Sequence, residues 1–125
     1  MMHVKAFCEV LNRKIMPTAK SYIAVKLVRE YGFTQLEVAR ILDMKQSAVN
    51  YVLTGRRKPK YYESLLSIHG FKQLLDETAA SLGTGGSIGF NQCDLCRSLF
   101  LRGLYRSVIE AVGEPVDELI SPARG

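Results

Sequence analysis

Residues 34–60 contain the pattern that most restricts how this chain can fold. They read TQLEVARILDM followed by KQSAVNYVLTGRRKPK. Apolar residues recur at helical spacing in both parts, which predicts two short helices joined by a tight turn. The buried sides of these helices are expected to be Val38, Ala39, Ile41 and Leu42 in the first and Val49, Val52 and Leu53 in the second.

Several positions in this pattern are typical of a helix-turn-helix motif. With Gln35 as the first position, Ala39 is the fifth, where two crossing helices leave no room for a larger side chain. Asp43 stands at the turn, where glycine is most often found, but aspartate tolerates a left-handed backbone better than most residues. Thr34, followed by Glu37 three residues later, predicts an N-cap with a capping box.

The face of the second helix that is not buried is polar, and a basic loop follows it. Helical hairpins also occur in many all-α proteins that never bind nucleic acid. The polar face together with GRRKPK favours a DNA-reading motif over residues 34–54. Gln46, Ser47 and Asn50 would then contact base edges, because amides bond bidentately to adenine and a hydroxyl suits several bases. The candidates for phosphate contacts are Gln35, Lys45, Arg56, Arg57 and Lys58.

The segment from Pro17 to Lys60 resembles the helix-turn-helix of the lambda-repressor/Cro-like (XRE) regulators, through FTQLEVARILDM and KQSAVNYVLTGRRKP. A longer resemblance is to a group of short archaeal transcriptional regulators of that class. It is carried by CEV at 8–10, by MPTAKSYIAVKLVREYGFTQ and by CDLC at 93–96. This group has one cysteine before the first helix and a CxxC after the DNA-binding domain. The resemblance implies a regulator with an iron–sulfur cluster that senses redox state or oxygen.

Charge is divided unevenly along the 125 residues. Residues 1–60 contain twelve Lys or Arg and four Asp or Glu, a net charge of +8, whereas residues 61–125 contain five and eight, a net charge of −3. The positive excess therefore accompanies the expected DNA-binding motif, where a phosphate backbone would need it. No apolar run is long enough to span a membrane, and the N-terminal residues lack the apolar core of a signal peptide. We therefore expect a cytoplasmic protein with no membrane partner.

The whole chain is expected to be all-α. We expect a DNA-binding domain of about five helices over 1–83, a connector over 84–91, and a C-terminal helix with the CxxC within 92–125. Outside the motif, a short extended or helical lead over 4–16 and helices over 17–31, 61–68 and 71–82 are expected. Pro17 would open the first of these helices and Gly32 would end it, while Gly70 would separate the last two. The glycine-rich connector lacks the Lys-Ser/Thr ending of a phosphate-binding loop.

The last expected helix, from about Gln92 to Val112, has a very wide apolar surface. Its polar residues occupy one stripe at every fourth position, namely Asp94, Ser98, Arg102, Arg106 and Glu110. A helix at the edge of a small domain needs less apolar surface than this. One side is therefore expected to pack on the domain and the other on a second subunit, because a homodimer reads more base pairs than one motif can. A central core helix in a monomer is the alternative.

All three cysteines, Cys8, Cys93 and Cys96, lie outside the motif. The i, i+3 spacing of the last two lets both thiolates reach one metal at a helix start. A four-ligand site needs one more donor, for which the candidates are His3, His69, Asp94, an exogenous thiol or another subunit. An iron–sulfur cluster tolerates a missing protein ligand, whereas structural zinc more usually takes four from the chain. A redox-active dithiol or unrelated buried thiols are the other interpretations.

The sequence offers little support for an enzyme. Neither His3 nor His69 lies near a nucleophile or a carboxylate partner. The acids of the second half, Asp76, Glu77, Asp117 and Glu118, are more simply a solvated surface. Two other classes remain: a protein- or RNA-binding module of the antitoxin or bridging-factor type, with structural cysteines or zinc, and a small electron-transfer protein. A DNA reader would differ from both by preferring one duplex and losing affinity steeply with salt.

Overall fold

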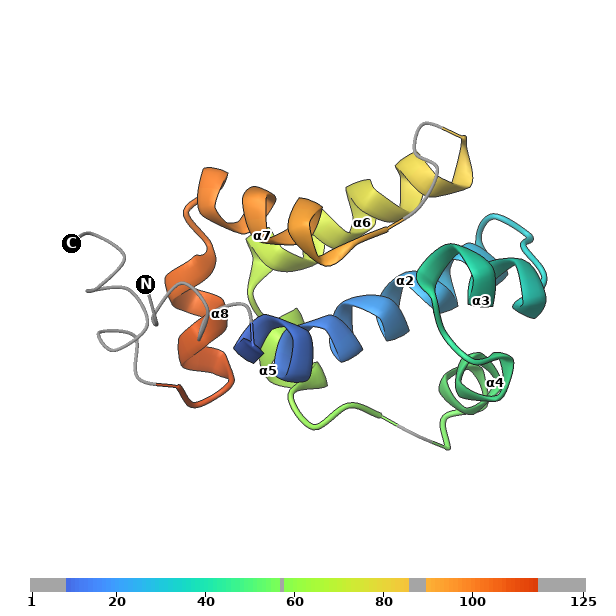
Figure 1. Ribbon diagram of the computed structural model, residues 1–125, viewed down its shortest axis with the longest axis horizontal. Helices are drawn as coiled ribbons and strands as arrows, with labels where there is room; N and C mark the ends of the chain where they lie inside the picture. Colours follow the sequence, from blue (N-terminus) through green and yellow to red (C-terminus); the bar gives the residue numbers. More distant parts are fainter. Residues whose placement is uncertain (1–8, 57, 86–89, 115–125) are drawn as a thin grey trace.

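The computed structural model of the chain describes residues 9–56, 58–85 and 90–114. This part of the chain is helical and contains no strand, which confirms the expected all-α class (Figure 1). In chain order the elements are η1 (Leu11–Ile15), α2 (Met16–Arg29), α3 (Gln35–Leu42), α4 (Gln46–Leu53), α5 (Tyr62–Leu66), α6 (His69–Gly83), α7 (Gln92–Leu101) and α8 (Tyr105–Ala111). Among the described residues, no helix has both the length and the apolar character needed to cross a membrane.

Helix α2 runs through the middle of the molecule (Figure 1). It packs along α6, and α3 and α4 pack against it and against each other. Toward the other end of the molecule, η1 contacts α7, and α5 contacts α8. The fully buried side chains of α2 include Ile23 and Leu27, whereas Tyr31 lies beyond the end of the helix and is half-buried. Each fully buried side chain of this size contributes about 1.5–3 kcal/mol to the free energy of folding.

Pro17 lies in the first turn of α2, as predicted, but the helical backbone begins before it. Glu9 and Val10 are helical, and the π-helical turn η1 leads directly into α2. The Met16 N–H donates to the carbonyl of Leu11, five residues back. A proline inside a helix lacks an N–H, and its ring crowds the carbonyl four residues earlier. The wider π turn provides the space that the proline ring needs.

The break between α5 and α6 lies at residues 67–68, so the prediction that Gly70 separates these helices was wrong. Gly70 is in the first turn of α6. A Cβ atom at this position would lie 2.8 Å from a Cδ atom of Leu104. The side chain of Leu104, the N-cap residue of α8, therefore packs closely against the backbone of α6 at this glycine.

The expected single C-terminal helix is two helices, and that prediction is also corrected. Gly103 adopts a left-handed φ of 68°, its N–H donates to the carbonyl of Phe100, and the Leu104 N–H donates to the carbonyl of Leu99 at 2.8 Å. These two bonds form the Schellman motif that ends a helix. The chain then turns, and Val108 and Ile109 of α8 are fully buried in the same apolar cluster as α2 and α6. Much of the wide apolar surface is therefore covered within the chain.

Candidate nucleic-acid interface

Helix α3 begins with the capping box that the sequence predicts. The Glu37 N–H donates to Thr34 Oγ1 at 3.1 Å, and the Thr34 N–H donates to Glu37 Oε1 at 2.9 Å. The backbone N–H of Thr34 lowers the pKa of the Glu37 carboxyl. Both bonds satisfy donors at the helix start that would otherwise lack partners. The first helix of the motif therefore has a fixed starting point, with Gln35 as its first residue, half-buried.

The turn between α3 and α4 depends on a left-handed residue. Asp43 has φ 53° and ψ 56°, and the Met44 N–H donates to the carbonyl of Ala39 at 2.9 Å. The expected left-handed conformation of Asp43 is thus confirmed. Ala39 and Val49 are buried, as predicted for the positions where the two helices face each other. Val52 and Leu53 are only half-buried, so the buried side of α4 is narrower than the sequence suggests.

Two side chains of α2 bond to the backbone of the motif, one at the turn before α4 and one at the last residue of α4. Lys20 Nζ donates to the carbonyl of Asp43 in the preceding turn at 3.4 Å, and Arg29 Nη2 donates to the carbonyl of Leu53 at 3.0 Å. Leu53 is the last residue of α4, where carbonyls lack intrahelical partners and attract cations. Sequence reasoning did not find these contacts, because each joins residues more than twenty positions apart.

The face of α4 turned away from the core is polar. Gln46 and Ser47 are exposed and Asn50 is half-buried. Tyr51, which the sequence analysis did not select, is 39% exposed and lies one helical turn after Ser47. Its i, i+4 spacing from Ser47 is the signal that identifies it as part of the same face. Gln46, Ser47, Asn50 and Tyr51 are thus the side chains of α4 that are accessible to a binding partner.

The start of α4 is suited to an anion. The first backbone bonds of the helix are donated by the N–H groups of Ala48 and Val49 to the carbonyl of Lys45. The N–H groups of Gln46 and Ser47 come before them, and among the described residues no side chain caps this end. Lys45 itself is exposed beside them. Amides of a first helical turn next to a cation attract phosphate groups.

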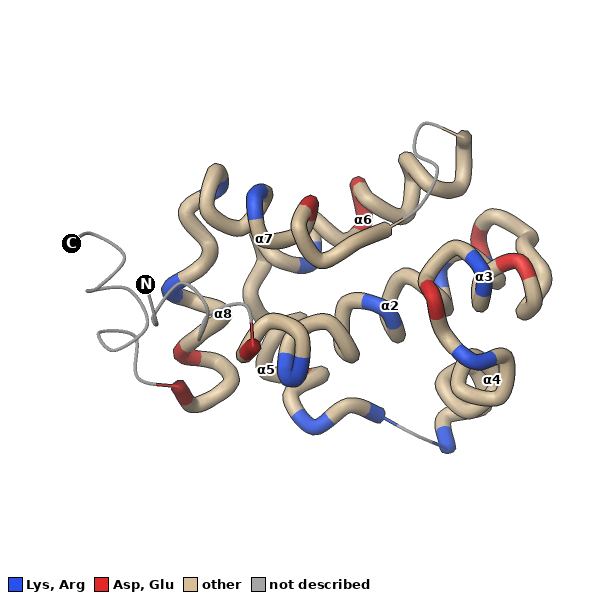
Figure 2. The backbone as a smooth tube through the Cα atoms, viewed as in Figure 1, with Lys and Arg blue, Asp and Glu red and all other residues tan. Residues whose placement is uncertain are grey.

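A cationic segment follows α4, and residues 44–62 contain no Asp or Glu. Figure 2 shows Lys and Arg positions at α4 and along the connection from α4 to α5. Arg56 and Lys58 are exposed, whereas Arg57 lies outside the described residues. Lys58 Nζ lies 3.4 Å from Glu63 Oε2 in an exposed ion pair. Exposed pairs of this kind are worth less than about 1 kcal/mol, so a phosphate can compete for the lysine.

The two cysteines that the structure describes lie in a different part of the molecule from α4. Cys93 is exposed and Cys96 is half-buried, both on the first turns of α7, whose N-cap residue Asn91 accepts a hydrogen bond from the Asp94 N–H at 2.9 Å. Cys8 and His3 lie outside the described residues. Among the residues described, no group of three His, Cys, Asp or Glu is close enough together to hold a metal ion. However, η1, which begins three residues after Cys8, packs against α7.

Comparison with known proteins adds no relative on which to base a function. The chain matches no protein-family model, and neither the curated proteins nor the solved structures contain a significant match.

Proposed function

We propose that this protein is a transcriptional regulator that binds double-stranded DNA in a sequence-specific manner, with α3 and α4 as a helix-turn-helix. The observation that carries the proposal is the geometry of α4. Lys20 bonds to the turn before it and Arg29 to its last residue, its inner face is anchored by buried Val49, and its outer face is polar. A recognition helix needs this combination, because base edges are read by side chains that a rigid scaffold holds in place.

Base readout is assigned to Gln46, Ser47 and Asn50 at the start of α4. In-vitro selection from random duplexes supplies the preferred site. Gln46→Ala or Asn50→Ala is then expected to weaken binding to that site by about 1–3 kcal/mol and to change binding to random DNA much less. Gln73→Ala, the same change at an exposed position of α6, is the matched control and leaves both affinities unchanged. Equal losses on both kinds of DNA would remove these residues from the readout role.

Phosphate contacts are assigned to Gln35, Lys45 and the cluster formed by Arg56, Arg57 and Lys58. Replacing Arg56 and Arg57 together by Gln is expected to weaken binding to all duplexes and to reduce the salt slope by about two counterions. The control is the replacement of Lys72 and Arg106 together by Gln. These two cations are exposed on α6 and α8, and their replacement is expected to leave the salt slope of DNA binding unchanged. A selection that enriches no duplex, with an unchanged slope, would favour the protein- or RNA-binding alternative.

A homodimer is part of this proposal, with a second copy of the chain covering the end of α7. Leu101 is 79% exposed, and Phe100, 45% exposed, stacks on the ring of Tyr105 at 4.6 Å between centroids. One helix-turn-helix contacts few base pairs, and two-fold pairing doubles the contact. Helix α4 and this apolar end of α7 lie at opposite ends of the molecule (Figure 1). The two recognition helices of such a dimer would therefore be far apart.

For the cysteines we propose an iron–sulfur cluster held by Cys8, Cys93 and Cys96, with zinc as the alternative metal. The described part of the chain contributes the two thiols of α7, and the packing of η1 on α7 supports placing Cys8 near them. The cluster would make the link between these two segments sensitive to redox state. Its fourth ligand is not assigned.

An absorption spectrum and metal analysis of anaerobically purified protein distinguish iron from zinc. Replacing all three cysteines by serine is expected to remove the metal and to change the affinity for the selected DNA site. If that variant binds the site as the wild type does, with and without oxidant, the sensing role fails and the cysteines are structural.

A further inference from the structure

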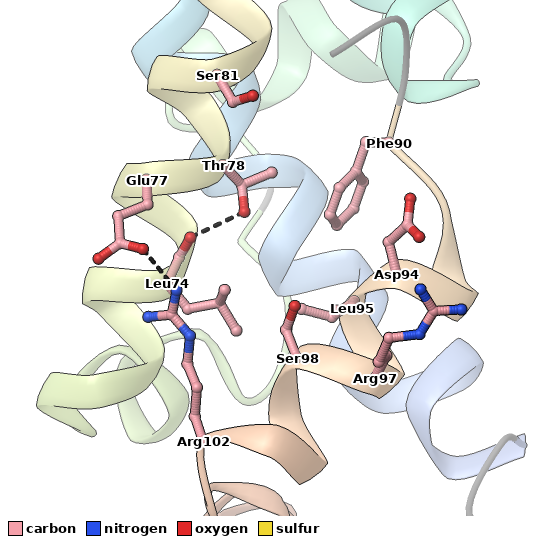
Figure 3. A pocket seen from close by; sticks show the side chains of 10 residues that line it. All are labelled: Leu74, Glu77, Thr78, Ser81, Phe90, Asp94, Leu95, Arg97, Ser98 and Arg102. Atoms are coloured by element: carbon pink, nitrogen blue, oxygen red, sulfur yellow. Dashed lines mark hydrogen bonds and ion pairs between the residues drawn. The ribbon is translucent and has the colours of Figure 1, made fainter. Parts of the chain in front are cut away.

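A cavity lies between α6 and α7, on the side of the molecule away from α4 (Figures 1 and 3). Its volume is about 340 Å³, within the range of small-molecule sites, at the lower end. Leu74, Leu95 and the ring of Phe90 form its apolar walls. Figure 3 shows the Phe90 ring and the Ser98 hydroxyl directed into the space between the two helices. The lining therefore combines three apolar side chains with seven polar or charged ones.

The acids at the edge of this cavity already have partners. Arg102 Nη2 donates to Glu77 Oε1 (Figure 3). This bond, together with the nearby positive charge, lowers the pKa of Glu77, which is therefore ionised at neutral pH. Asp94 Oδ2 accepts a hydrogen bond from Asn91 Nδ2 at 2.9 Å. Glu77 is thus paired with a cation, whereas the partner of the Asp94 carboxylate is a neutral amide.

The cations at the same cavity have donors to spare. A guanidinium has five N–H donors, and Glu77 accepts from one nitrogen of Arg102. Within the described ranges, no hydrogen bond or ion pair involves the guanidinium of Arg97, which also lines the cavity. The spare donors at this cavity are therefore positively charged. Groups of this kind bind carboxylates, most strongly in bidentate geometry.

We propose that this cavity binds a small organic carboxylate with an apolar or aromatic body. The carboxylate would accept hydrogen bonds from Arg102 and Ser98, and the body would lie against Phe90 and Leu95. Helices α6 and α2 pack on each other, and α2 bonds to the turn before α4 and to the last residue of α4. A ligand between α6 and α7 therefore acts on the helix that supports α4. An effect on DNA affinity rests on the function proposed above, but the binding itself does not.

The test is a titration of the protein with benzoate in the absence of DNA. Binding is monitored through the backbone amide chemical shifts in NMR spectra. Benzoate is expected to shift the signals of α6 and α7 residues around the cavity, whereas benzamidine, its cationic analogue, leaves them in place. Arg102→Gln is expected to weaken benzoate binding about 10-fold or more, because a hydrogen bond to a charged group is lost. Glu77→Gln is expected to strengthen it a few-fold, because it removes a competing charge and leaves an oxygen acceptor for Arg102.

Arg106→Gln, the same change at an exposed position of α8, is the control and leaves benzoate binding unchanged. Arg102→Lys, which keeps the ion pair with Glu77 but loses the planar fork, provides a second variant should Arg102→Gln not fold. If Arg102→Lys binds benzoate more weakly than the wild type does, the result supports carboxylate binding at this cavity. The proposal is overturned if benzoate shifts none of the cavity residues, if benzamidine shifts them equally, or if Arg102→Gln and Arg106→Gln behave alike. Benzoate binding by a protein that selects no DNA site would leave the cavity proposal standing and refute the regulator.

Discussion

At the scale of single residues, Asp76 is the polar group that most tightly joins α2 to α6. Tyr22 Oη donates to Asp76 Oδ1, and Lys26 Nζ lies 2.9 Å from the same oxygen. Desolvation opposes ionisation of Asp76, but the bonds from Tyr22 and Lys26 outweigh it and lower the pKa of the carboxyl. Burial, together with the bond to Asp76, raises the pKa of Tyr22 to about 12, and the bond to Asp76 raises that of Lys26.

Asp76→Asn is therefore expected to reduce the free energy of unfolding at pH 7. The side chain is 39% exposed, so solvent screening limits the loss to about 1 kcal/mol. A lowered carboxyl pKa stabilises the fold above the unfolded value of about 3.9 and loses that effect as pH falls through the folded value. The difference between wild type and variant, measured by urea unfolding, should thus disappear in acid.

The matched control for Asp76 is Glu30→Gln. Glu30 pairs with the same lysine at 3.5 Å, but its side chain is 58% exposed, and an exposed i, i+4 pair contributes only about 0.3–0.5 kcal/mol. If Glu30→Gln lowers the free energy of unfolding as much as Asp76→Asn does, the importance assigned to the interface between α2 and α6 is contradicted.

At the scale of elements, four helices end in the same way. After α3, α4, α7 and α8 the chain passes through a left-handed residue, namely Asp43, Gly55, Gly103 and Gly113. In each case the N–H of the next residue donates to a carbonyl five positions back. The first two ends were anticipated from the sequence, because turn residues there separate clear helical patterns. The end at Gly103 was not, because apolar residues continue on both sides of it.

Gly103→Ala tests whether this residue divides the C-terminal helix. A Cβ at Gly103 would meet no atom within 4 Å, so the cost is conformational, about 1–2 kcal/mol for a left-handed residue with a side chain. Gly103→Asn is expected to lose less stability than Gly103→Ala, because asparagine tolerates the left-handed conformation better than alanine. Thermal unfolding measures the stability of both variants. If Gly103→Ala is neutral or stabilising and the helix content rises, α7 and α8 can form the single long helix that the sequence suggested.

At the scale of the whole molecule, the ends of the fold differ in character. The α4 end is polar and cationic, whereas the end formed by α7 and α8 exposes Phe100 and Leu101. The dimer proposed above would cover these two side chains. The described α7 and α8 are short and separately packed, so a dimer would use the end of α7 and not one long helix.

Leu101→Glu is expected to convert a wild-type dimer into a monomer, because burying an unpaired carboxylate at a two-fold contact places like charges together. Sedimentation at several protein concentrations measures the change, and affinity for a two-half-site duplex should fall with it. Leu36→Glu changes another exposed leucine, 46% exposed on α3, and should leave the oligomeric state unchanged. A wild type that is monomeric at every concentration would refute the dimer.

The sequence by itself determined the local features of this fold. The capping box of Thr34 and Glu37, the left-handed Asp43 and the buried Ala39 and Val49 all follow from residues a few positions apart. Helix starts, turns and amphipathic faces depend on hydrogen bonds and side-chain spacing within one or two helical turns. Such signals are present in the chain before any packing occurs.

Only the tertiary structure decided which segments meet. The bonds from Lys20 and Arg29 to the backbone of the turn before α4 and of its last residue, the approach of Leu104 to Gly70, and the cavity edge formed by Glu77 and Arg102 join distant parts of the chain. Periodicity shows which face of a helix is apolar but not which helix covers it. That choice is made by the packing of the whole core around α2, because side-chain volumes and backbone approaches must fit together simultaneously.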